Sequence, residues 1–192
     1  RLFVSHFTDG RVAEVTGGVE RVLSPSGLVG PFGLDRLPDG SLLSADALAV
    51  NLTDGAGVSR TIMSLLADLP GMAVDVAHVG ADPLVLLARG QVLRRRPDGR
   101  LDSVAGRLEG ATALVSTASG GPGGAAGAFL VESGAGRISF LDGEGGVVPM
   151  ATGLDRPQAV AEGADGSLWV TGAGAVCQVV EGRVMARFDG FD

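Results

Sequence analysis

The stretch that decides the fold is Pro157-Gln-Ala-Val-Ala161 followed by Gly163-Ala-Asp-Gly-Ser-Leu-Trp-Val-Thr-Gly172. It joins a proline, a short apolar run, an Asp-Gly turn and a second apolar run. The same order occurs in Pro31-Phe-Gly-Leu-Asp35 and Pro38-Asp-Gly-Ser-Leu-Leu-Ser44. A glycine after aspartate supplies the positive φ that a tight hairpin turn requires. The chain therefore repeats a unit of short strands joined by hairpins.

The repeat has a regular period. Weaker copies begin at Pro70 and Gly110, so the units start at positions 31, 70, 110 and 157. The two clearest starts are 126 residues apart, which is three periods of 42 residues. A second series of glycine turns has a similar period and comprises Gly17-Gly18, Asp54-Gly55, Asp98-Gly99, Asp142-Gly143 and Glu181-Gly182. Two series with one period indicate a repeat protein.

Each complete unit divides into four short apolar segments. The third unit predicts strands at Met72–Val79, Leu84–Ala88, Val92–Arg95 and Leu101–Ala105, and the last unit at Gln158–Ala161, Ser167–Thr171, Ala175–Val179 and Val184–Phe188. Residues 1 to 30 predict only three, at Leu2–Phe7, Val12–Val15 and Val19–Leu23. Four strands in a unit of about 40 residues are typical of a β-propeller. A β-solenoid would have a shorter repeat, and helical repeats would show a 3.6-residue apolar stripe, which is absent.

We therefore expect an all-β fold, a β-propeller of four-stranded blades with four complete blades and one partial blade. The expected single domain covers residues 1-192, with a partial blade at 1-30 and blades at 31-69, 70-109, 110-156 and 157-192. The first unit lacks its innermost strand.

Composition excludes several classes of protein. The 192 residues carry a net charge of −7, whereas a nucleic-acid binder needs a basic surface. No apolar stretch approaches the roughly 18 residues that span a bilayer. The single cysteine, Cys177, cannot form an internal disulfide and is interpreted as a small core side chain. We thus expect no nucleic-acid partner and no membrane span.

The quoted stretch at residues 157–172 resembles the NHL-type blade, in which a Pro-x-Gly-Ile-Ala strand leads through Asp-Gly-x-Leu-Tyr-Val into the next strand. Phe129-Leu-Val-Glu-Ser-Gly-Ala-Gly-Arg-Ile138 and Leu2-Phe-Val-Ser-His-Phe-Thr-Asp-Gly-Arg-Val12 look like the following turn. The superfamily that the chain is similar to includes NHL-repeat proteins, gluconolactonase-like (SGL) enzymes, strictosidine synthase-like proteins and virginiamycin B lyase. This resemblance covers nearly the whole chain, and it is specific for fold rather than for activity.

The resemblance implies a six-bladed ring, which is larger than the strands counted here. Four complete units and one three-stranded unit give 4 × 4 + 3 = 19 strands, against 24 in six complete blades. An open ring would leave apolar faces and unpaired strand edges at the gap. We expect that a segment is missing upstream of Arg1 or that another chain or domain closes the ring. A five-bladed ring with one short blade is the compact alternative.

In the lactonase-like group, the resemblance implies a divalent metal held by Glu, Asn and Asp where the innermost strands begin. The corresponding positions here are Gly33, Met72, Thr112 and Gln158, and none is Asn. Gln158 could offer its amide oxygen, but nothing else completes a site. No metal site or other cofactor is therefore evident, and a divalent cation such as calcium is the cofactor that oxygen ligands would favour.

The resemblance to virginiamycin B lyase implies a histidine and acidic residues that abstract a proton beside a metal. The chain has only His6 and His78. His6 ends a strand near Asp9 and is interpreted as a turn residue at the rim. His78 is interpreted as a strand residue whose ring is hydrogen-bonded locally.

Acidic residues follow the second strand of several units, which places them on one rim of the ring. Asp9, Asp46 and Glu132 project from equivalent turns in three units, although aspartate in a turn commonly caps backbone amides. The predicted ligand-binding rim consists of His6, Asp9, Asp46, Glu132 and Gln158. We expect a small molecule or a protein to bind at this propeller face.

Two other motifs predict no chemistry. Gly120–Gly127 resembles a phosphate loop only superficially, because the chain has no lysine and no helix follows, so a long inter-strand loop is expected. Arg94-Arg-Arg96 is interpreted as a solvated outer edge. No Gly-x-Ser-x-Gly elbow supports a serine nucleophile.

The sequence thus favours a ligand- or protein-binding NHL-like β-propeller without an assembled catalytic set. The alternative is a metal-dependent lactonase, hydrolase or lyase of the gluconolactonase or virginiamycin B lyase type. Whether the protein is an enzyme is left open by the sequence.

Overall fold

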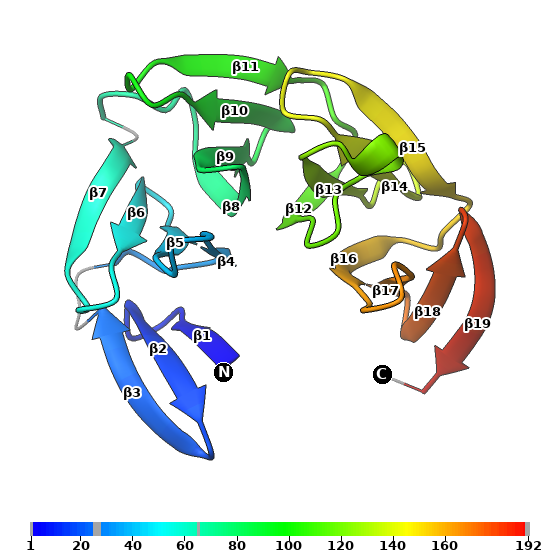
Figure 1. Ribbon diagram of the computed structural model, residues 1–192, viewed down its shortest axis with the longest axis horizontal. Coiled ribbons are helices and arrows are strands. Elements are labelled where there is room, and N and C mark those ends of the chain that lie inside the picture. Colours follow the sequence, from blue (N-terminus) through cyan, green and yellow to red (C-terminus); the bar gives the residue numbers. More distant parts are fainter. Residues whose placement is uncertain (1, 25–27, 65, 191–192) are drawn as a thin grey trace.

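The computed structural model describes residues 2–24, 28–64 and 66–190. In these residues the chain forms 19 strands and one short 3-10 turn. The strands form five antiparallel sheets in chain order, which are arranged radially around an axis (Figure 1). The prediction of an all-β propeller with one partial blade is confirmed.

The first sheet has three strands and the other four sheets have four strands each. The first sheet consists of β1 (Leu2–His6), β2 (Arg11–Thr16) and β3 (Val19–Ser24). The second consists of β4 (Leu34–Arg36), β5 (Leu42–Ala45), β6 (Ala49–Thr53) and β7 (Ser59–Ser64). The third consists of β8 (Ala73–Val79), β9 (Asp82–Leu87), β10 (Gln91–Arg95) and β11 (Leu101–Ala105). The fourth consists of β12 (Ala111–Ser116), β13 (Ala128–Glu132), β14 (Arg137–Leu141) and β15 (Val147–Thr152), with the turn η1 (Pro122–Gly124) between β12 and β13. The fifth consists of β16 (Pro157–Glu162), β17 (Leu168–Gly172), β18 (Ala175–Val180) and β19 (Arg183–Asp189).

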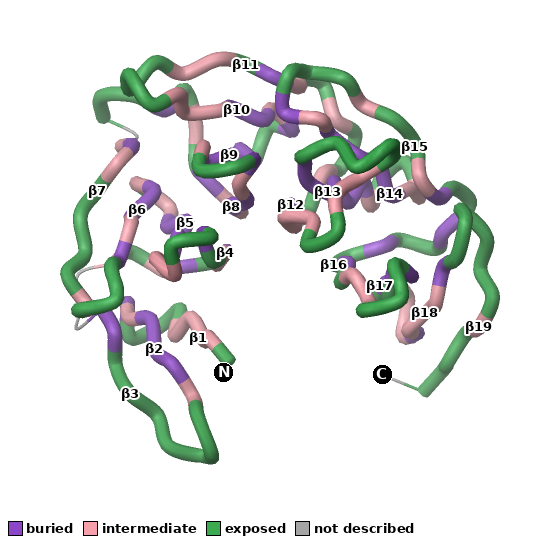
Figure 2. Tube along the Cα trace, viewed as in Figure 1, coloured by how far each residue is buried: buried purple, intermediate pink, exposed green. Residues whose placement is uncertain are grey.

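The core lies between neighbouring sheets. Strands β4, β8, β12 and β16 lie nearest the axis, and burial is concentrated in the strands next to them (Figures 1 and 2). Leu84–Leu87 of β9 is buried throughout, because alternate side chains of a strand point to opposite faces and both faces are covered. Leu86 and Leu130 pack together between the third and fourth sheets, for example. Burying each such side chain stabilises the fold by about 1.5–3 kcal/mol.

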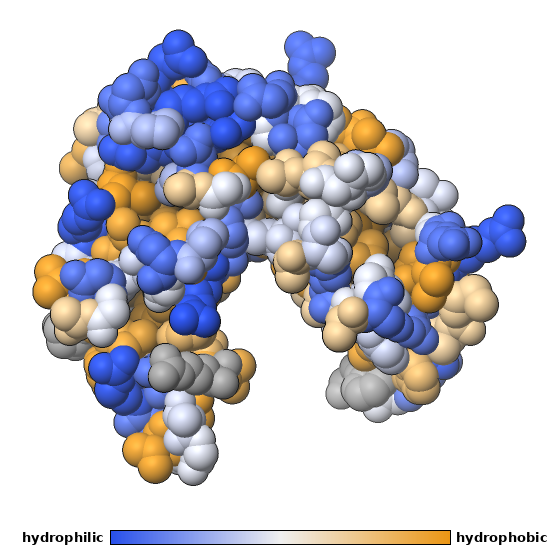
Figure 3. Space-filling model, viewed as in Figure 1, coloured by the Kyte–Doolittle hydropathy of each residue, from blue (hydrophilic) through white to orange (hydrophobic). Residues whose placement is uncertain are grey.

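The described residues form an open ring. Figure 3 shows an opening between the first and fifth sheets that side chains do not fill. Phe129 and Trp169 are each the second residue of the second strand in their sheet, but Phe129 is 3% exposed under the fifth sheet and Trp169 is 36% exposed. The Trp169 ring stacks on Phe188, with centroids 6.0 Å apart, on the uncovered face. The five sheets, one of them three-stranded, thus leave a gap in the ring of the described residues.

The interpretation of Arg94-Arg-Arg96 as a solvated outer edge is wrong. The Arg94 side chain is only 12% exposed and forms ion pairs with Asp82 in its own sheet and with Glu144 in the next. Arg96 also pairs with Glu144 and with Asp102, and it lowers the pKa of both carboxyl groups. The cluster thus joins the third and fourth sheets. No helix among the described residues has the length and apolar character needed to cross a bilayer.

Candidate functional site

The three consecutive innermost strands bring together an aspartate, a histidine and a serine. Asp35 lies on β4, His78 on β8 and Ser116 on β12, so each comes from a different sheet. Asp35 Oδ2 is 2.6 Å from His78 Nδ1 and 2.7 Å from Ser116 Oγ. The exposed fractions of the His78 and Asp35 side chains are 15% and 17%. The expectation that His78 would be bonded locally is wrong, because both partners lie on neighbouring sheets.

The contacts of this group determine where its protons lie. The Ser116 hydroxyl donates to Asp35, and Ser116 Oγ accepts the His78 backbone N–H at 2.7 Å. The proton on His78 Nδ1 is then the one that points to the Asp35 carboxylate. In the neutral imidazole only one ring nitrogen carries a proton, so Nε2 is left with a lone pair. No described residue forms a hydrogen bond with Nε2.

This geometry differs from a serine nucleophile triad. In such a triad the aspartate contacts one ring nitrogen of the histidine and the serine contacts the other. Here Ser116 Oγ is 2.8 Å from Nδ1, the same nitrogen that faces Asp35. Ser116 therefore cannot pass its proton to Nε2, and its role is to position Asp35 and His78.

A second carboxyl group lies beside the first. Asp75 on β8 accepts hydrogen bonds from its neighbour Val76 N and from Leu114 N on β12. Burial, with a smaller effect from the nearby Asp35 carboxylate, raises the pKa of Asp75 to about 7. Gly33 makes room for this group, since a Cβ at that position would lie 2.0 Å from Asp75 Oδ1.

His78 also borders a cavity. The cavity has a volume of about 240 Å³ and is lined by His78, by Gly80 after β8 and by the loop that connects β12 to β13. The loop spans residues 117–127, as the glycine run predicted. It packs closely on β14, because Cβ atoms at Gly121 and Gly127 would lie 2.1 and 2.4 Å from the Phe140 ring. Only glycine fits these two contacts.

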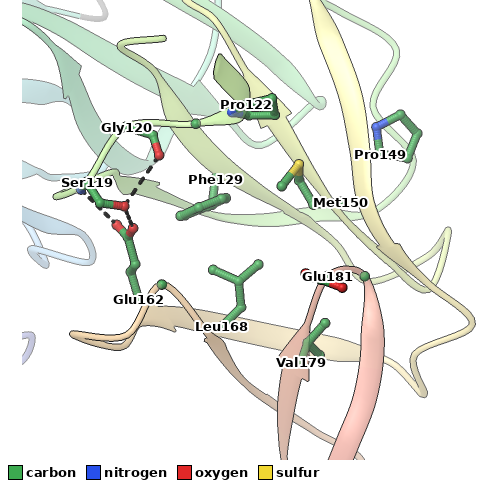
Figure 4. Close-up of a pocket in the computed structure, with 13 residues that line it drawn as sticks. Ser119, Gly120, Pro122, Phe129, Pro149, Met150, Glu162, Leu168, Val179 and Glu181 are labelled. Carbon is green, nitrogen blue, oxygen red and sulfur yellow. Dashed lines mark hydrogen bonds between the residues drawn. The ribbon is translucent and has the colours of Figure 1, made fainter. Parts of the chain in front are cut away.

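A larger cavity lies on the other side of the same loop. It has a volume of about 370 Å³ and is enclosed by the loop, by β15 and by strands of the fifth sheet (Figure 4). Ser119 and Gly120 line both cavities. Glu162, at the end of β16, accepts the Ala118 N–H at 2.7 Å and the Ser119 hydroxyl. Glu162 therefore holds the loop between the two cavities.

Two residues of the predicted rim have buried carboxylates. Asp46 is 3% exposed and accepts hydrogen bonds from the N–H groups of Val29, Leu48 and Ala49. Glu132 is fully buried. It bonds to Arg137 at 2.5 and 2.7 Å and to Ser139 at 2.9 Å. Both side chains support the turns that follow their strands.

The other three rim residues lie closer to solvent. His6 Nε2 is 3.3 Å from Glu20, and Asp9 lies 3.5 Å from Arg11 in the turn after β1. Gln158 is exposed on β16, where its backbone carbonyl accepts a hydrogen bond from the Thr112 hydroxyl. None of the five rim side chains bonds to another in the described part of the chain.

The rim and the histidine site lie at opposite ends of the innermost strands. Glu132 pairs with Ala111 at the start of β12, whereas Ser116 at the end of β12 pairs with Ala128. His78 likewise lies near the end of β8, where it pairs with Pro83. The ligand-binding role of the rim stays a prediction.

The described residues do not fit a divalent metal centre. Within residues 2–24, 28–64 and 66–190, no group of three or more His, Cys, Asp or Glu side chains is arranged to hold an ion. At the starts of the innermost strands, Gln158 and Thr112 are the oxygen donors among the four expected positions. Calcium binding stays a prediction that metal analysis of the purified protein can test.

Asp35, Asp75, Ser116 and Glu162 are not among the site residues that the sequence predicts. A signal was present, because Asp35 and Asp75 end the same repeated motif in Pro31–Asp35 and Gly71–Asp75. Glu162 follows the corresponding run of the last unit. A carboxylate at the end of this motif in three of four units predicts acidic groups on the innermost strands. Which side chain each of these acids contacts depends on the angle at which neighbouring sheets pack.

The fold and this site define the chain as a β-propeller whose innermost strands carry hydrogen-bonded polar side chains near the axis. No protein-family model and no curated protein matches the sequence. Among solved structures, a catalytically inactive His-to-Ala variant of virginiamycin B lyase from Staphylococcus aureus, with quinupristin, matches at a TM-score of 0.73 and 14% identity. A putative gluconolactonase matches at a TM-score of 0.71 and 14% identity. The calcium-binding protein regucalcin from Agrobacterium tumefaciens matches at a TM-score of 0.69 and 19% identity.

The matches cover nearly all of this chain but only part of the other proteins. The match with the lyase covers 97% of this chain and 65% of the lyase chain. The match with the gluconolactonase covers 94% of this chain and 71% of the other, and the match with regucalcin covers 95% of this chain and 68% of the other. The chain thus spans about two thirds of the length of these proteins. At these identities the likeness shows the fold, and activity must be argued from the site.

Proposed function

We propose that the protein is an enzyme that binds a small organic molecule on the ring face where the innermost strands end, and that His78 exchanges a proton with it. The observation that carries this proposal is the orientation of the imidazole. Its Nδ1 is held by Asp35 at 2.6 Å, while the ring borders a cavity of about 240 Å³. A general base needs a fixed ring and one accessible nitrogen.

The chemistry follows from these contacts. His78 Nε2 accepts a proton from a carbon acid or a water molecule in the cavity, and the imidazole becomes positively charged. The Asp35 carboxylate stabilises this charge and holds the ring in the required tautomer. Ser116 fixes the carboxylate by donating its hydroxyl proton to Asp35. The imidazolium then returns the proton to the leaving group, which completes an elimination or a hydrolysis.

The comparisons support a reaction of this class. The fold is shared with a lyase that has an inactive His-to-Ala variant and with a putative gluconolactonase. Both names describe reactions on small organic molecules. This chain spans about two thirds of the length of those proteins, so their reactions are part of this proposal and not of the structural comparison.

The test is to assay gluconolactone hydrolysis and quinupristin cleavage with the purified chain and its variants. We expect turnover of one compound, and a loss of about 100-fold or more in His78→Gln, which is typical for a general base. Asp35→Asn should lose activity by a similar factor, whereas Asp98→Asn, a matched substitution in the exposed turn between β10 and β11, should retain it. Full activity in His78→Gln would contradict the proposal.

A second candidate is binding without turnover at a propeller face. It is favoured by the fact that Asp35, His78 and Ser116 also tie three innermost strands together, which is a structural role in itself. In that case the compound that binds would be unchanged after incubation. Affinity would also be equal in the native chain and in His78→Gln.

A further inference from the structure

We propose that the larger cavity, between the fourth and fifth sheets, binds an organic cation that has an apolar body and one ammonium group. This cavity does not include His78, and the proposal goes beyond the proton transfer described above. Its volume of about 370 Å³ lies in the range of small-molecule sites, which is roughly 300–1,000 Å³.

The floor of the cavity is apolar. Phe129, Met150, Leu168 and Val179 converge on its middle (Figure 4). Phe129, Leu168 and Val179 are almost completely buried and belong to the core cluster between the two sheets. These side chains are held by packing, so the surface that a ligand would meet is already formed. An apolar body gains free energy when it leaves water for this floor.

The charge of the cavity is negative. Glu162 and Glu181 line it, and none of its lining residues, all of which are described, is basic. In the described part of the chain, neither carboxylate has an Arg or His within ion-pair distance. Glu162 keeps free acceptor capacity, because a carboxylate has about four acceptor sites and its hydrogen-bond partners among the described residues are Ala118 and Ser119. A cation is therefore favoured over a neutral molecule or an anion.

The positions of the two acids make the site specific for an ammonium group on an apolar body. Glu162 lies beside the loop, and Glu181 lies in the turn between β18 and β19 (Figure 4). The apolar floor lies between them. The Phe129 ring offers a further attraction, since a cation within about 6 Å of an aromatic face is stabilised. Inorganic cations would gain nothing from the apolar floor.

The test is a titration with three probes of one shape, namely 2-phenylethylamine, 2-phenylethanol and phenylacetate. Methyl-labelled methionine provides the readout, because the chain has four methionines and only Met150 lines this cavity. Met63 lies in a different core cluster, and Met72 and Met185 are exposed, so they serve as internal controls. We expect the Met150 methyl resonance to shift with the amine at the lowest concentration of the three probes.

Variants test the role of charge. Glu181→Gln should weaken binding of the amine about fivefold, as expected for the loss of one partly solvated charge partner. It should leave binding of 2-phenylethanol unchanged. Glu162→Gln should act similarly while keeping an acceptor for the Ala118 N–H. Glu109→Gln, an exposed acid outside the cavity, is the matched control and should have no effect.

Three results would overturn the proposal. The first is equal affinity for the amine and the alcohol, and the second is a response at Met72 or Met185 without one at Met150. The third is no shift of Met150 up to about 10 mM amine, which would be weaker than any useful small-molecule affinity. His78→Gln should leave the titration unchanged, so failure here is distinct from failure of the proton-transfer proposal.

Discussion

Asp35 and His78 are 43 residues apart in the chain, and their side chains meet at 2.6 Å between two innermost strands. The contact predicts the tautomer of the imidazole. Neutral His78 should carry its proton on Nδ1, where Asp35 accepts it, and nitrogen chemical shifts of a labelled sample would report this. Asp35→Asn should shift the tautomer population toward Nε2–H. A predominantly Nε2–H imidazole in the native chain would contradict the assignment.

The pKa of Asp75 predicts how stability depends on pH. The folded chain holds this proton up to about pH 7, whereas the unfolded chain releases it near 3.8. The native state thus binds the Asp75 proton between these values, so the contribution of Asp75 to the free energy of unfolding is greatest below about pH 4 and falls by up to about 4 kcal/mol as pH rises toward 7. Denaturant unfolding at several pH values measures this slope. Asp75→Asn should flatten it, and Asp9→Asn, at an exposed turn, should not.

Gly33 predicts a severe effect of a single methyl group. In Gly33→Ala the new Cβ would lie 2.0 Å from Asp75 Oδ1 and 2.7 Å from Asp75 Cα, so backbone must move. We expect a loss of stability of more than about 2 kcal/mol, as for other overpacked sites. Gly106→Ala is the matched control, because nothing lies within 4 Å of a Cβ there. Equal unfolding midpoints for the two variants would argue against the close contact.

Phe129 and Trp169 predict opposite outcomes at equivalent positions. Phe129→Ala empties a site that is 3% exposed and should cost about 3–5 kcal/mol. Trp169→Ala removes a larger side chain from an uncovered face and should cost much less. Thermal unfolding of both variants measures the difference. If Trp169→Ala were as costly as Phe129→Ala, then Trp169 would be buried in solution, for example against another sheet.

Glu132 predicts a large effect of losing one charge partner. The carboxylate is fully buried and bonds to Arg137 and Ser139. Glu132→Ala leaves the buried Ser139 hydroxyl without its acceptor, whereas Arg137, whose side chain is 37% exposed, can turn to water, so the variant should cost about 2 kcal/mol. Asp9→Ala, which removes an exposed carboxylate at another predicted rim position, should cost less than about 1 kcal/mol. Chemical denaturation compares the two, and similar losses would refute a structural role for Glu132.

Several features of the fold follow from local patterns and were predictable. The three-stranded first sheet and the four four-stranded sheets correspond to the counted apolar segments, and the predicted Leu101–Ala105 is β11 without change. Turn residues and alternating apolar runs act over a few residues, so they can be recognised without knowledge of the rest of the chain.

The candidate site was less predictable, because its contacts join distant parts of the chain. The Asp-terminated motif indicated acids on the innermost strands, but it did not show that Asp35 would meet His78. Arg94 gave the opposite signal, since a run of three arginines suggested a solvated edge while Glu144 of the next sheet neutralises and covers it. These outcomes depend on sheet twist and on the register between sheets.

The amino-acid sequence by itself determined that the chain is a ring of short antiparallel sheets, because hairpin turns and strand periodicity are encoded locally. Tertiary structure alone decided which polar groups face one another at the axis and which surfaces enclose the two cavities. The physical reason is that neighbouring sheets touch through residues that are 38 to 43 positions apart in the chain, and the angle at which the sheets pack sets the distances between those residues.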